Sequence, residues 1–344
     1  MNSGSMNSSN RPKNVAAEPL DQIAQKIGES RRIVITSHLR PDGDSLCTSL
    51  ALACSAELLG KEAAIINKDK TPYPFLMFPD SKKIQIGQIY PKTYDAVILL
   101  ECADVSRSGQ ENLDGYFKIN IDHHYSNDRY ADIDWVEPHV CAVGEMAYAL
   151  CQKLGITLTP QIANHLYCAI ASDTGSFQFS NTTARAFEIC HLLVQAGAKP
   201  IQISEALFHN YLPEKVKLLG QVLSTLEMNK AGDIAVISMF LKDLRALHLN
   251  EIDTEDITTL ARSIKGVSVV LFFKEMDHET FRVSIRSKGE AHAAAIAEHF
   301  GGGGHAHAAG FTVYGPYRRL IKEIPRTIEK LLRKMPAGPD TASS

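Results

Sequence analysis

Asp122, His123 and His124 stand directly after a mostly apolar run, residues 116–121, that has the pattern of a buried strand. A carboxylate beside two imidazoles at the carboxyl end of a strand offers ligands for a divalent metal ion. A single histidine in such a place is more often a core residue than a ligand. The triplet gains weight because three other acidic clusters follow apolar segments in the same way.

The second cluster, residues 37–44, lies between a predicted strand and a predicted helix. A proline and a glycine inside it favour a tight turn, in which His38, Asp42 and Asp44 can converge. The alternative is a polar turn in which Asp44 caps the following helix.

Two further carboxylates occupy comparable positions. Glu101 is the first polar residue after the apolar run 96–100, and a carboxylate at the edge of a core is costly unless it is paired or metal-bound. A salt bridge from Glu101 to Arg107 is the simpler alternative. Asp173 follows an apolar segment and precedes a Gly/Ser-rich loop, which alone would indicate only a turn.

Carboxylates gathered this closely repel one another, so several would stay protonated at neutral pH unless cations were bound. Carboxylate and imidazole ligands without thiolates favour hard or borderline ions such as Mn²⁺. Two such ions suit attack on phosphorus, so phosphoester hydrolysis is the leading reaction. The candidate ligands are His38, Asp42, Asp44, Glu101, Asp104, His123, His124 and Asp173.

The last cluster combines Arg286 and Ser287 with the glycine run 301–304 and His305. Consecutive glycines let phosphate oxygens approach the backbone N–H groups, and Arg286 with His305 could complete an anion clamp. The alternative is a flexible hinge.

Strands alternate with helices along the first part of the chain, which predicts an α/β fold with a doubly wound, mostly parallel sheet. Ligands of such sheets bind beyond the carboxyl ends of the strands. The predicted strands are 33–36, 63–66, 96–100 and 118–121, and the predicted helices are 45–59, 143–153, 160–170 and 183–195.

The pattern predicts a catalytic domain followed by a helical connector and a smaller α/β domain. Strands are expected near 234–238, 267–274 and 281–287, and helices near 292–300 and 317–335. The expected divisions are a disordered extension at 1–17, a catalytic domain at 18–200, a connector at 201–229, a second domain at 230–336 and a tail at 337–344.

The composition of the chain excludes several classes of protein. The 344 residues are 44% hydrophobic and 22% charged, with a formal net charge of -3, so long nucleic acids would find no basic sheath. The seven cysteines include no CxxC pair, as in reduced intracellular proteins. No apolar run is long enough for a membrane span, so we expect a cytoplasmic protein without a membrane partner, and we allow for a homodimer.

Taken in order, five segments resemble the DHH-family phosphoesterases that carry a DHH-associated C-terminal domain. The segments are SHLRPDGDSL (37–46), ECADVSRSG (101–109), NIDHHYSND (120–128), ASDTGSFQFSNT (171–182) and GGGGHAHAAG (301–310). The resemblance covers residues 20–335, and within the family it is greatest to the compact bacterial nanoRNase/pAp phosphatases.

The resemblance implies a role for each matching residue. His38 and Asp42 resemble ligands of a first metal ion, Asp44 and His123 resemble ligands of a second, and Asp173 matches the ligand of the fourth motif. Asp122 would orient His123, and His124 would touch the scissile phosphate or the attacking water. Arg107 is expected to be a further catalytic residue. The substrate-binding elements would be Arg286, Ser287, Gly302, Gly303, Gly304 and His305.

One departure from the family concerns the second motif. The family usually has Asp six residues before its Arg, as the ligand that bridges the metal ions, whereas this chain has Glu101 there. The additional methylene moves the carboxylate by about 1 to 1.5 Å. We expect Glu101 to bridge the ions, with Asp104 as the alternative.

The expected protein is a metal-dependent phosphoesterase, with two divalent ions, most simply Mn²⁺, and a bridging hydroxide that attacks the phosphate. The family implies cleavage of short oligoribonucleotides and removal of the 3′-phosphate from 3′-phosphoadenosine 5′-phosphate. Two alternatives are a cyclic-dinucleotide phosphodiesterase and a catalytically silent nucleotide-binding protein whose metal site was lost through Glu101.

Overall fold

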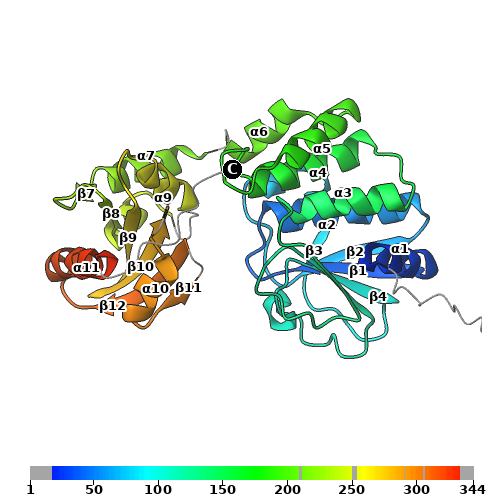
Figure 1. The fold of residues 1–344 in the computed structure, drawn as a ribbon, viewed down its shortest axis with the longest axis horizontal. Helices are drawn as coiled ribbons and strands as arrows, with labels where there is room; N and C mark the ends of the chain where they lie inside the picture. The colour runs from blue at the N-terminus through cyan, green and yellow to red at the C-terminus, as the bar shows by residue number, and fades with distance from the viewer. Residues whose placement is uncertain (1–17, 209–210, 250–253, 290, 305–306, 334–344) are drawn as a thin grey trace, which may run out of the picture. The chain divides into compact units, whose positions relative to one another are not determined.

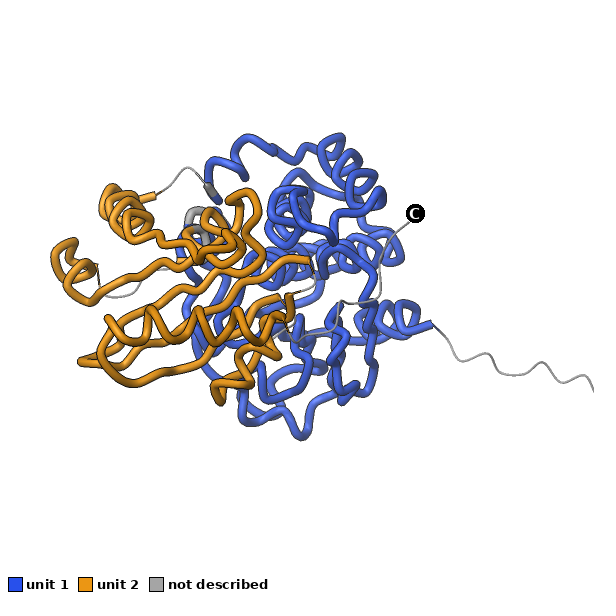
Figure 2. The backbone as a smooth tube through the Cα atoms, turned by 60° about the vertical axis from the view of Figure 1, so that its left-hand side comes forward, with its two compact units in different colours: residues 1–210 blue, residues 211–344 orange. Residues whose placement is uncertain are grey.

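The computed structural model describes residues 18–208, 211–249, 254–289, 291–304 and 307–333. The chain forms two compact units, residues 1–210 and 211–344 (Figure 2). The expected N-terminal extension at 1–17, the tail at 337–344 and His305 lie outside the described residues. Among the described residues, no helix is both long and apolar enough to cross a membrane.

Unit 1 is built on a six-stranded sheet in the order β3-β2-β1-β4-β5-β6, in which every neighbouring pair is parallel (Figure 1). The chain turns back after β3 to place β4 beside β1, which creates a topological switch point between these two strands. The strands are β1 (Arg32–Ser37), β2 (Glu62–Asn67), β3 (Ile84–Ile86), β4 (Ala96–Leu100), β5 (Lys118–Asp122) and β6 (Ile133–Val136).

The central strands are continuous apolar runs because both faces of the sheet are covered. Ile98 and Leu100 of β4 face a core shared with helices α1 to α5, whereas Val97 and Leu99 pack against Ile89 and other residues from non-helical segments. The α/β class with a mostly parallel sheet, predicted from the sequence, is confirmed. The helices of unit 1 are α1 (Pro19–Glu29), α2 (Gly43–Leu58), α3 (Val143–Lys153), α4 (Pro160–Asp173), α5 (Ala184–Gln195) and α6 (Pro200–Phe208), with short 3₁₀ helices η1 (Phe75–Met77), η2 (Pro79–Lys83) and η3 (Val105–Ser108).

Unit 2 holds a second six-stranded sheet, in the order β11-β12-β10-β9-β8-β7. Only the β8–β9 pair of this sheet is parallel, and β10 is hydrogen-bonded between β9 and β12. The strands are β7 (Glu227–Met228), β8 (Ile234–Met239), β9 (Val269–Asp277), β10 (Thr280–Ser287), β11 (Gly303–Gly304) and β12 (Ala308–Tyr314).

Two helical layers cover this second sheet, because side chains of its central strands alternate between two cores. α10 (Ala293–His299) and α11 (Tyr317–Leu332) share one core with Phe273, and α7 (Pro213–Leu223), α8 (Leu241–Ala246) and α9 (Glu255–Arg262) share the other with Phe272. The segment expected as a connector is divided, since α6 belongs to unit 1 and α7 to unit 2.

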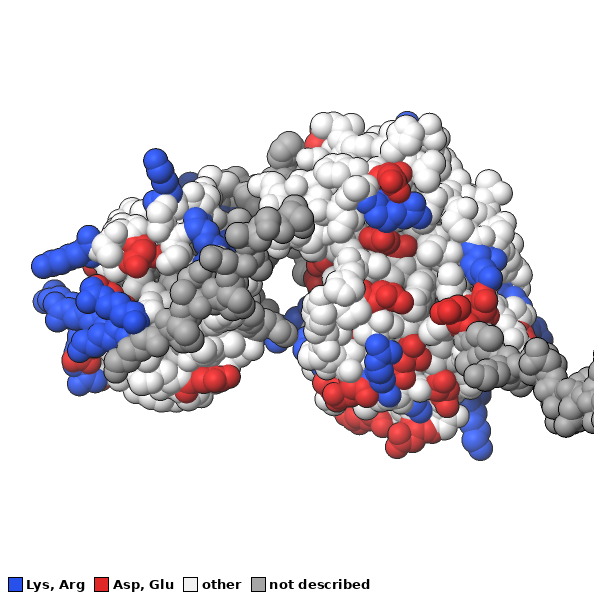
Figure 3. All heavy atoms as spheres, viewed as in Figure 1, with Lys and Arg blue, Asp and Glu red and all other residues white. Residues whose placement is uncertain are grey.

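Charge is distributed differently on the two units. On the face shown in Figure 3, acidic and basic side chains are interspersed over unit 1, whereas basic side chains gather over α11 of unit 2. The sequence of α11 explains the second feature, because its buried positions are apolar while arginine and lysine occupy many of its exposed ones.

Candidate metal centre

The turn after β1 is fixed by a reciprocal cap at the start of α2. Asp42 accepts a hydrogen bond from the Ser45 N–H at 3.0 Å, and the Ser45 hydroxyl accepts one from the Asp42 N–H at 3.2 Å. Asp42, rather than Asp44, therefore caps the helix. The other oxygen of Asp42 lies 3.7 Å from Nε2 of His38, so the two side chains face each other across the turn.

Asp44 points from the first turn of α2 into the protein, where it is 1% exposed. Its carboxylate accepts hydrogen bonds from the backbone N–H groups of Val143 (2.6 Å) and Gly144 (2.9 Å), at the start of α3. Burial and the negative charge of Asp173 nevertheless raise its pKa to about 8. The helix N-terminus positions this carboxylate without neutralising the repulsion from its neighbour.

Glu101 follows β4 in a left-handed backbone conformation, with φ of 55°, and is 2% exposed. Its Oε1 lies 3.4 Å from Nε2 of His123, and its buried Oε2 has no hydrogen-bond partner among the described residues. Burial and the charges of Asp42, Asp44 and Asp173 raise its pKa well above the ordinary range. An orphaned buried carboxylate oxygen among like charges is the feature that a bound cation would explain.

The ion-pair contact of Glu101 in the described part of the chain is with His123 rather than Arg107. Arg107 instead holds the first turn in place, since its carbonyl accepts a hydrogen bond from the Leu39 N–H at 2.6 Å. Burial lowers the pKa of His38, but pairing with Asp42 raises it overall, and the positive charge of Arg107 only opposes that rise. Asp104, the alternative bridging residue, caps η3 by accepting hydrogen bonds from the N–H groups of Ser106 and Arg107.

The Asp122-His123-His124 triplet ends β5 with its two histidines in different contacts. Asp122 is fully buried, and its Oδ1 lies 2.6 Å from Nδ1 of His124. The same oxygen accepts hydrogen bonds from the backbone N–H groups of both histidines. The side-chain amide of Asn127 donates to its other oxygen at 2.6 Å. Asp122 therefore orients the ring of His124, and not the ring of His123 as predicted from the sequence.

Asp173 is the last residue of α4, and its Oδ2 lies 3.9 Å from Nε2 of His123. Asn181 holds this carboxylate by donating from its side-chain amide at 3.1 Å. The same Nδ2 lies within hydrogen-bond distance of the backbone carbonyls of Cys141 and Asp173, so it ties the end of α4 to the start of α3.

Three sets of potential ligand atoms meet at this edge of the sheet, and within each set the atoms lie within 4.8 Å of one another. Glu101 and His123 each belong to two sets, which joins all three into one centre. The residue types fit divalent cations, because carboxylates and imidazoles are their common ligands. The raised pKa values fit them too, because the carboxylates repel one another unless cations compensate their charges. The sets are His38-Asp42-Glu101, Asp44-His123-Asp173 and Glu101-His123-His124.

In unit 2, Arg286 and Ser287 end strand β10. The buried Ser287 donates its N–H to the carbonyl of His307 at 3.0 Å, and its hydroxyl lies 3.2 Å from Nδ1 of the same histidine. The guanidinium of Arg286 donates to the Ile285 carbonyl at 3.1 Å. His305 lies outside the described residues, so its relation to these side chains stays a prediction.

The four consecutive glycines at 301–304 differ in what they do for the fold. Gly301 follows α10 with φ of 75°. A Cβ on Gly302 would lie 2.2 Å from the carbonyl oxygen of Gly310, and a Cβ on Gly304 would lie 2.5 Å from Cα of Ala309. These three positions thus have a backbone or packing reason to be glycine. Gly303 has no such reason within the described part of the chain, because a Cβ there would meet none of its atoms within 4 Å.

Three polar residues that support the centre or the end of β10 were not predicted from the sequence. Asn127 and Asn181 hold carboxylates, and His307 contacts Ser287. All three lie within segments that carried the family resemblance, which is the signal that could have found them. No spacing rule connects His307 with Ser287, because the two residues meet only through the pairing of β10 with β12.

The fold and the centre agree with the similarity of the chain to known proteins. The models of the DHH family, N-terminal domain, and of the DHHA1 domain match residues 32–170 and 229–334. The bifunctional oligoribonuclease and PAP phosphatase NrnA of Thermus thermophilus is 33% identical over 297 residues, 85% of this chain and 89% of that protein. The protein of the same name from Bacillus subtilis is 28% identical over 82% of this chain and 89% of its own length.

A solved structure extends the likeness to three dimensions. The crystal structure of an exopolyphosphatase-related protein from Bacteroides fragilis has a TM-score of 0.84 and 25% identity, and covers 94% of this chain and 100% of that one. The class defined by the fold and the centre is a two-domain α/β phosphoesterase. The chain belongs to the DHH family, with a DHHA1 domain as its second unit.

Proposed function

We propose that this protein hydrolyses phosphoester bonds in short oligoribonucleotides and releases the 3′-phosphate of 3′-phosphoadenosine 5′-phosphate. The observation that carries the proposal is the joining of three ligand sets through Glu101 and His123. The names of the Thermus thermophilus and Bacillus subtilis relatives support this choice of substrates.

The ligand sets suit two divalent ions, and we propose Mn²⁺ because carboxylates and imidazoles are its ligands here. His38 and Asp42 would hold one ion, Asp44, His123 and Asp173 the other, and Glu101 both. When bound, such ions supply a reactive water at neutral pH and stabilise negative charge on phosphate oxygens.

Residues that do not bind the ions have roles set by their contacts. Asp122 accepts a hydrogen bond from the Nδ1–H of His124, which leaves Nε2 of that ring available to the substrate phosphate or its leaving oxygen. Asn127 fixes the orientation of Asp122. Arg107 keeps the first turn beside η3 through its backbone, and we propose that its guanidinium binds phosphate oxygens.

In unit 2, Arg286 and Ser287 would bind the end of the substrate that is remote from the bond to be cleaved. Gly303 supports this role, because its backbone is open to a ligand while its glycine neighbours are needed for packing. Together with His305, which lies outside the described residues, and with Gly302 and Gly304 in the same loop, these residues form the proposed substrate-binding element.

Asp42→Ala and His123→Ala each test the metal centre. Each change should lower hydrolysis roughly a thousandfold or more, because a lost ligand removes several kcal/mol of charge stabilisation. Hydrolysis of a dinucleotide and Mn²⁺ binding by calorimetry are measured together, with Asp114→Ala, an exposed carboxylate of the same unit, as the matched control.

Both variants should remain folded without metal but melt below the unmodified chain, because Asp42→Ala removes the cap of α2 and His123→Ala removes the imidazole that faces Glu101 and Asp173. Near-normal turnover or unchanged Mn²⁺ binding in either variant would refute the assignment.

A further inference from the structure

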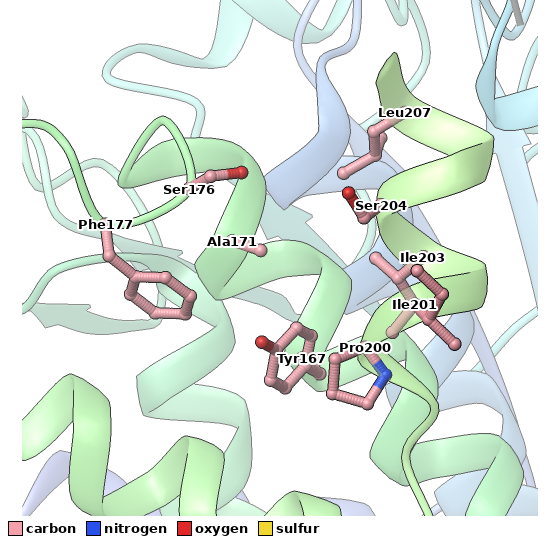
Figure 4. A pocket seen from close by; sticks show the side chains of 9 residues that line it. All are labelled: Tyr167, Ala171, Ser176, Phe177, Pro200, Ile201, Ile203, Ser204 and Leu207. Atoms are coloured by element: carbon pink, nitrogen blue, oxygen red, sulfur yellow. The ribbon is translucent and has the colours of Figure 1, made fainter. Parts of the chain in front are cut away.

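A pocket of about 350 Å³ opens in unit 1 beside the loop that follows Asp173 (Figure 4). Its volume lies within the range of small-molecule sites. Ser176 and Ser204 approach the opening from opposite sides, with Ala171 and Tyr167 between them. The remaining lining residues are Phe177, Pro200, Ile201, Ile203 and Leu207.

One wall of this pocket is held in an uncommon backbone conformation. Gly175, Ser176 and Phe177 are consecutive and all have positive φ, of 55°, 56° and 67°. Hydrogen bonds stabilise the loop, since the N–H of Ser176 donates to the Ala171 carbonyl at 2.7 Å and that of Phe177 to the Thr174 hydroxyl at 3.2 Å. Non-glycine residues held in this way are concentrated at functional sites.

Aromatic packing fixes the side chain of Phe177 beside the opening. Its ring stacks on Phe187, with centroids 5.1 Å apart and an interplanar angle of 26°. The ring of Tyr167 meets it edge-on at 6.2 Å. The pocket thus has rigid aromatic surfaces, and the hydroxyls of Tyr167, Ser176 and Ser204 are its side-chain polar groups.

The lining identifies the kind of group that would bind. Among the described residues, the lining contains no lysine, arginine or histidine that could pair with a phosphate. A flat heterocycle suits it, because aromatic and aliphatic walls cover the ring faces while hydroxyls can pair with ring-edge nitrogens and oxygens. The substrates proposed for this protein contain such a group in their bases.

Helix α4 contributes both to the pocket and to the metal centre. Ala171 lines the pocket, while Asp173, two residues later in the last turn of α4, contributes to the ligand set with Asp44 and His123. The loop that follows Asp173 forms one wall of the pocket, so the pocket and the ligand set meet at the same end of α4.

We infer that this pocket binds a nucleobase of the substrate next to the scissile phosphate. The inference rests on the proposed function and adds to it a base-recognition site within unit 1, formed by Tyr167, Ser176, Phe177 and Ser204.

Filling the pocket with Ser204→Trp tests the inference, and Gln202→Trp is the matched control, since Gln202 is exposed on the same helix outside the lining. The substrates are 5′-phosphorylated diadenylate and its two abasic analogues, each lacking one base. With Mn²⁺, Ser204→Trp should raise KM for diadenylate about tenfold, because the base can no longer enter the pocket. It should leave KM unchanged for one of the two analogues, the one that lacks the base bound in the pocket. Gln202→Trp should change neither value. A KM that rises equally for all three compounds, or for none, overturns the inference.

A second readout does not depend on turnover. Saturation-transfer NMR with adenosine and the full-length, metal-free protein should show base signals that Ser204→Trp abolishes and Gln202→Trp retains. If Ser204→Trp lowers the melting temperature, Ser204→Leu replaces it in both experiments. If the unmodified chain does not hydrolyse these substrates with Mn²⁺, the proposed function is contradicted but the pocket is not. The NMR experiment then tests the pocket, and a lack of saturation transfer to adenosine overturns the inference.

Discussion

Glu101 shows at the scale of one residue how the chain accommodates a change in its metal centre. The residue combines a left-handed backbone with a fully buried side chain, and one carboxylate oxygen has no hydrogen-bond partner among the described residues. A longer side chain can reach the place of a shorter one when the backbone conformation changes with it. The position of Glu101 in two ligand sets supports its role as the bridging ligand over Asp104, which caps η3.

Glu101→Gln separates the metal-binding role of this residue from a packing role. The amide keeps the volume but cannot ionise, so it relieves the cost of burying a carboxyl group whose pKa is raised by burial and neighbouring charges. Thermal unfolding at pH 7 should show a metal-free variant at least as stable as the unmodified chain, and a smaller stabilisation by Mn²⁺. The exposed Glu111→Gln is the control. Full stabilisation of Glu101→Gln by Mn²⁺ would exclude Glu101 as a ligand.

At the scale of elements, the sequence was sufficient for the strands that position the centre. β1, β4 and β5 are buried on both faces, so they appear as apolar runs followed by charged residues. The strands that were not predicted are β3, β6, β7, β11 and β12. β3 has three residues at the sheet edge, and β12 contains small residues whose place is set by pairing with β10. The contacts of Asn127 and Asn181 depend on tertiary structure and could not be derived from spacing.

Gly303 and Gly304 form strand β11 and provide a paired test of the glycine loop. Gly304→Ala should destabilise unit 2 by about 1–3 kcal/mol, because Gly304 has φ of 149° and a Cβ there would lie 2.5 Å from Cα of Ala309. Gly303→Ala should leave unfolding unchanged but raise KM, since the added methyl group would contact no described residue and would enter the space where we propose that the substrate binds. Chemical unfolding and dinucleotide kinetics measure the two effects. An unchanged KM for Gly303→Ala would remove this glycine from the proposed substrate-binding element.

At the scale of the whole molecule, the carboxylate cluster links folding stability to pH and metal. The pKa of Asp44 is about 8 in the folded chain, against an ordinary value of 3.8. Between these values the unfolded chain loses its proton first, so the stability of the metal-free protein should fall as pH rises from about 4 to about 8. Ions bind the deprotonated carboxylates, and Mn²⁺ affinity should therefore increase over the same interval.

Melting temperatures recorded with chelator and with Mn²⁺ across this interval check both statements. Asp44→Asn should flatten the pH dependence of the chelated protein, because the amide does not titrate. Stabilisation by Mn²⁺ that is equal at pH 5.5 and pH 8 would contradict the linkage between proton release and metal binding.

The substrate class is tested most directly by one assay of hydrolysis with Mn²⁺. It compares end-labelled RNA dinucleotides, pentanucleotides and much longer oligomers with 3′-phosphoadenosine 5′-phosphate, using Asp42→Ala to exclude a contaminating nuclease. We predict rapid turnover of the shortest RNAs, release of the 3′-phosphate from the bisphosphate and a decline in rate with RNA length. Equal rates for short and long RNA, or no release of phosphate from any of these compounds, would contradict the account.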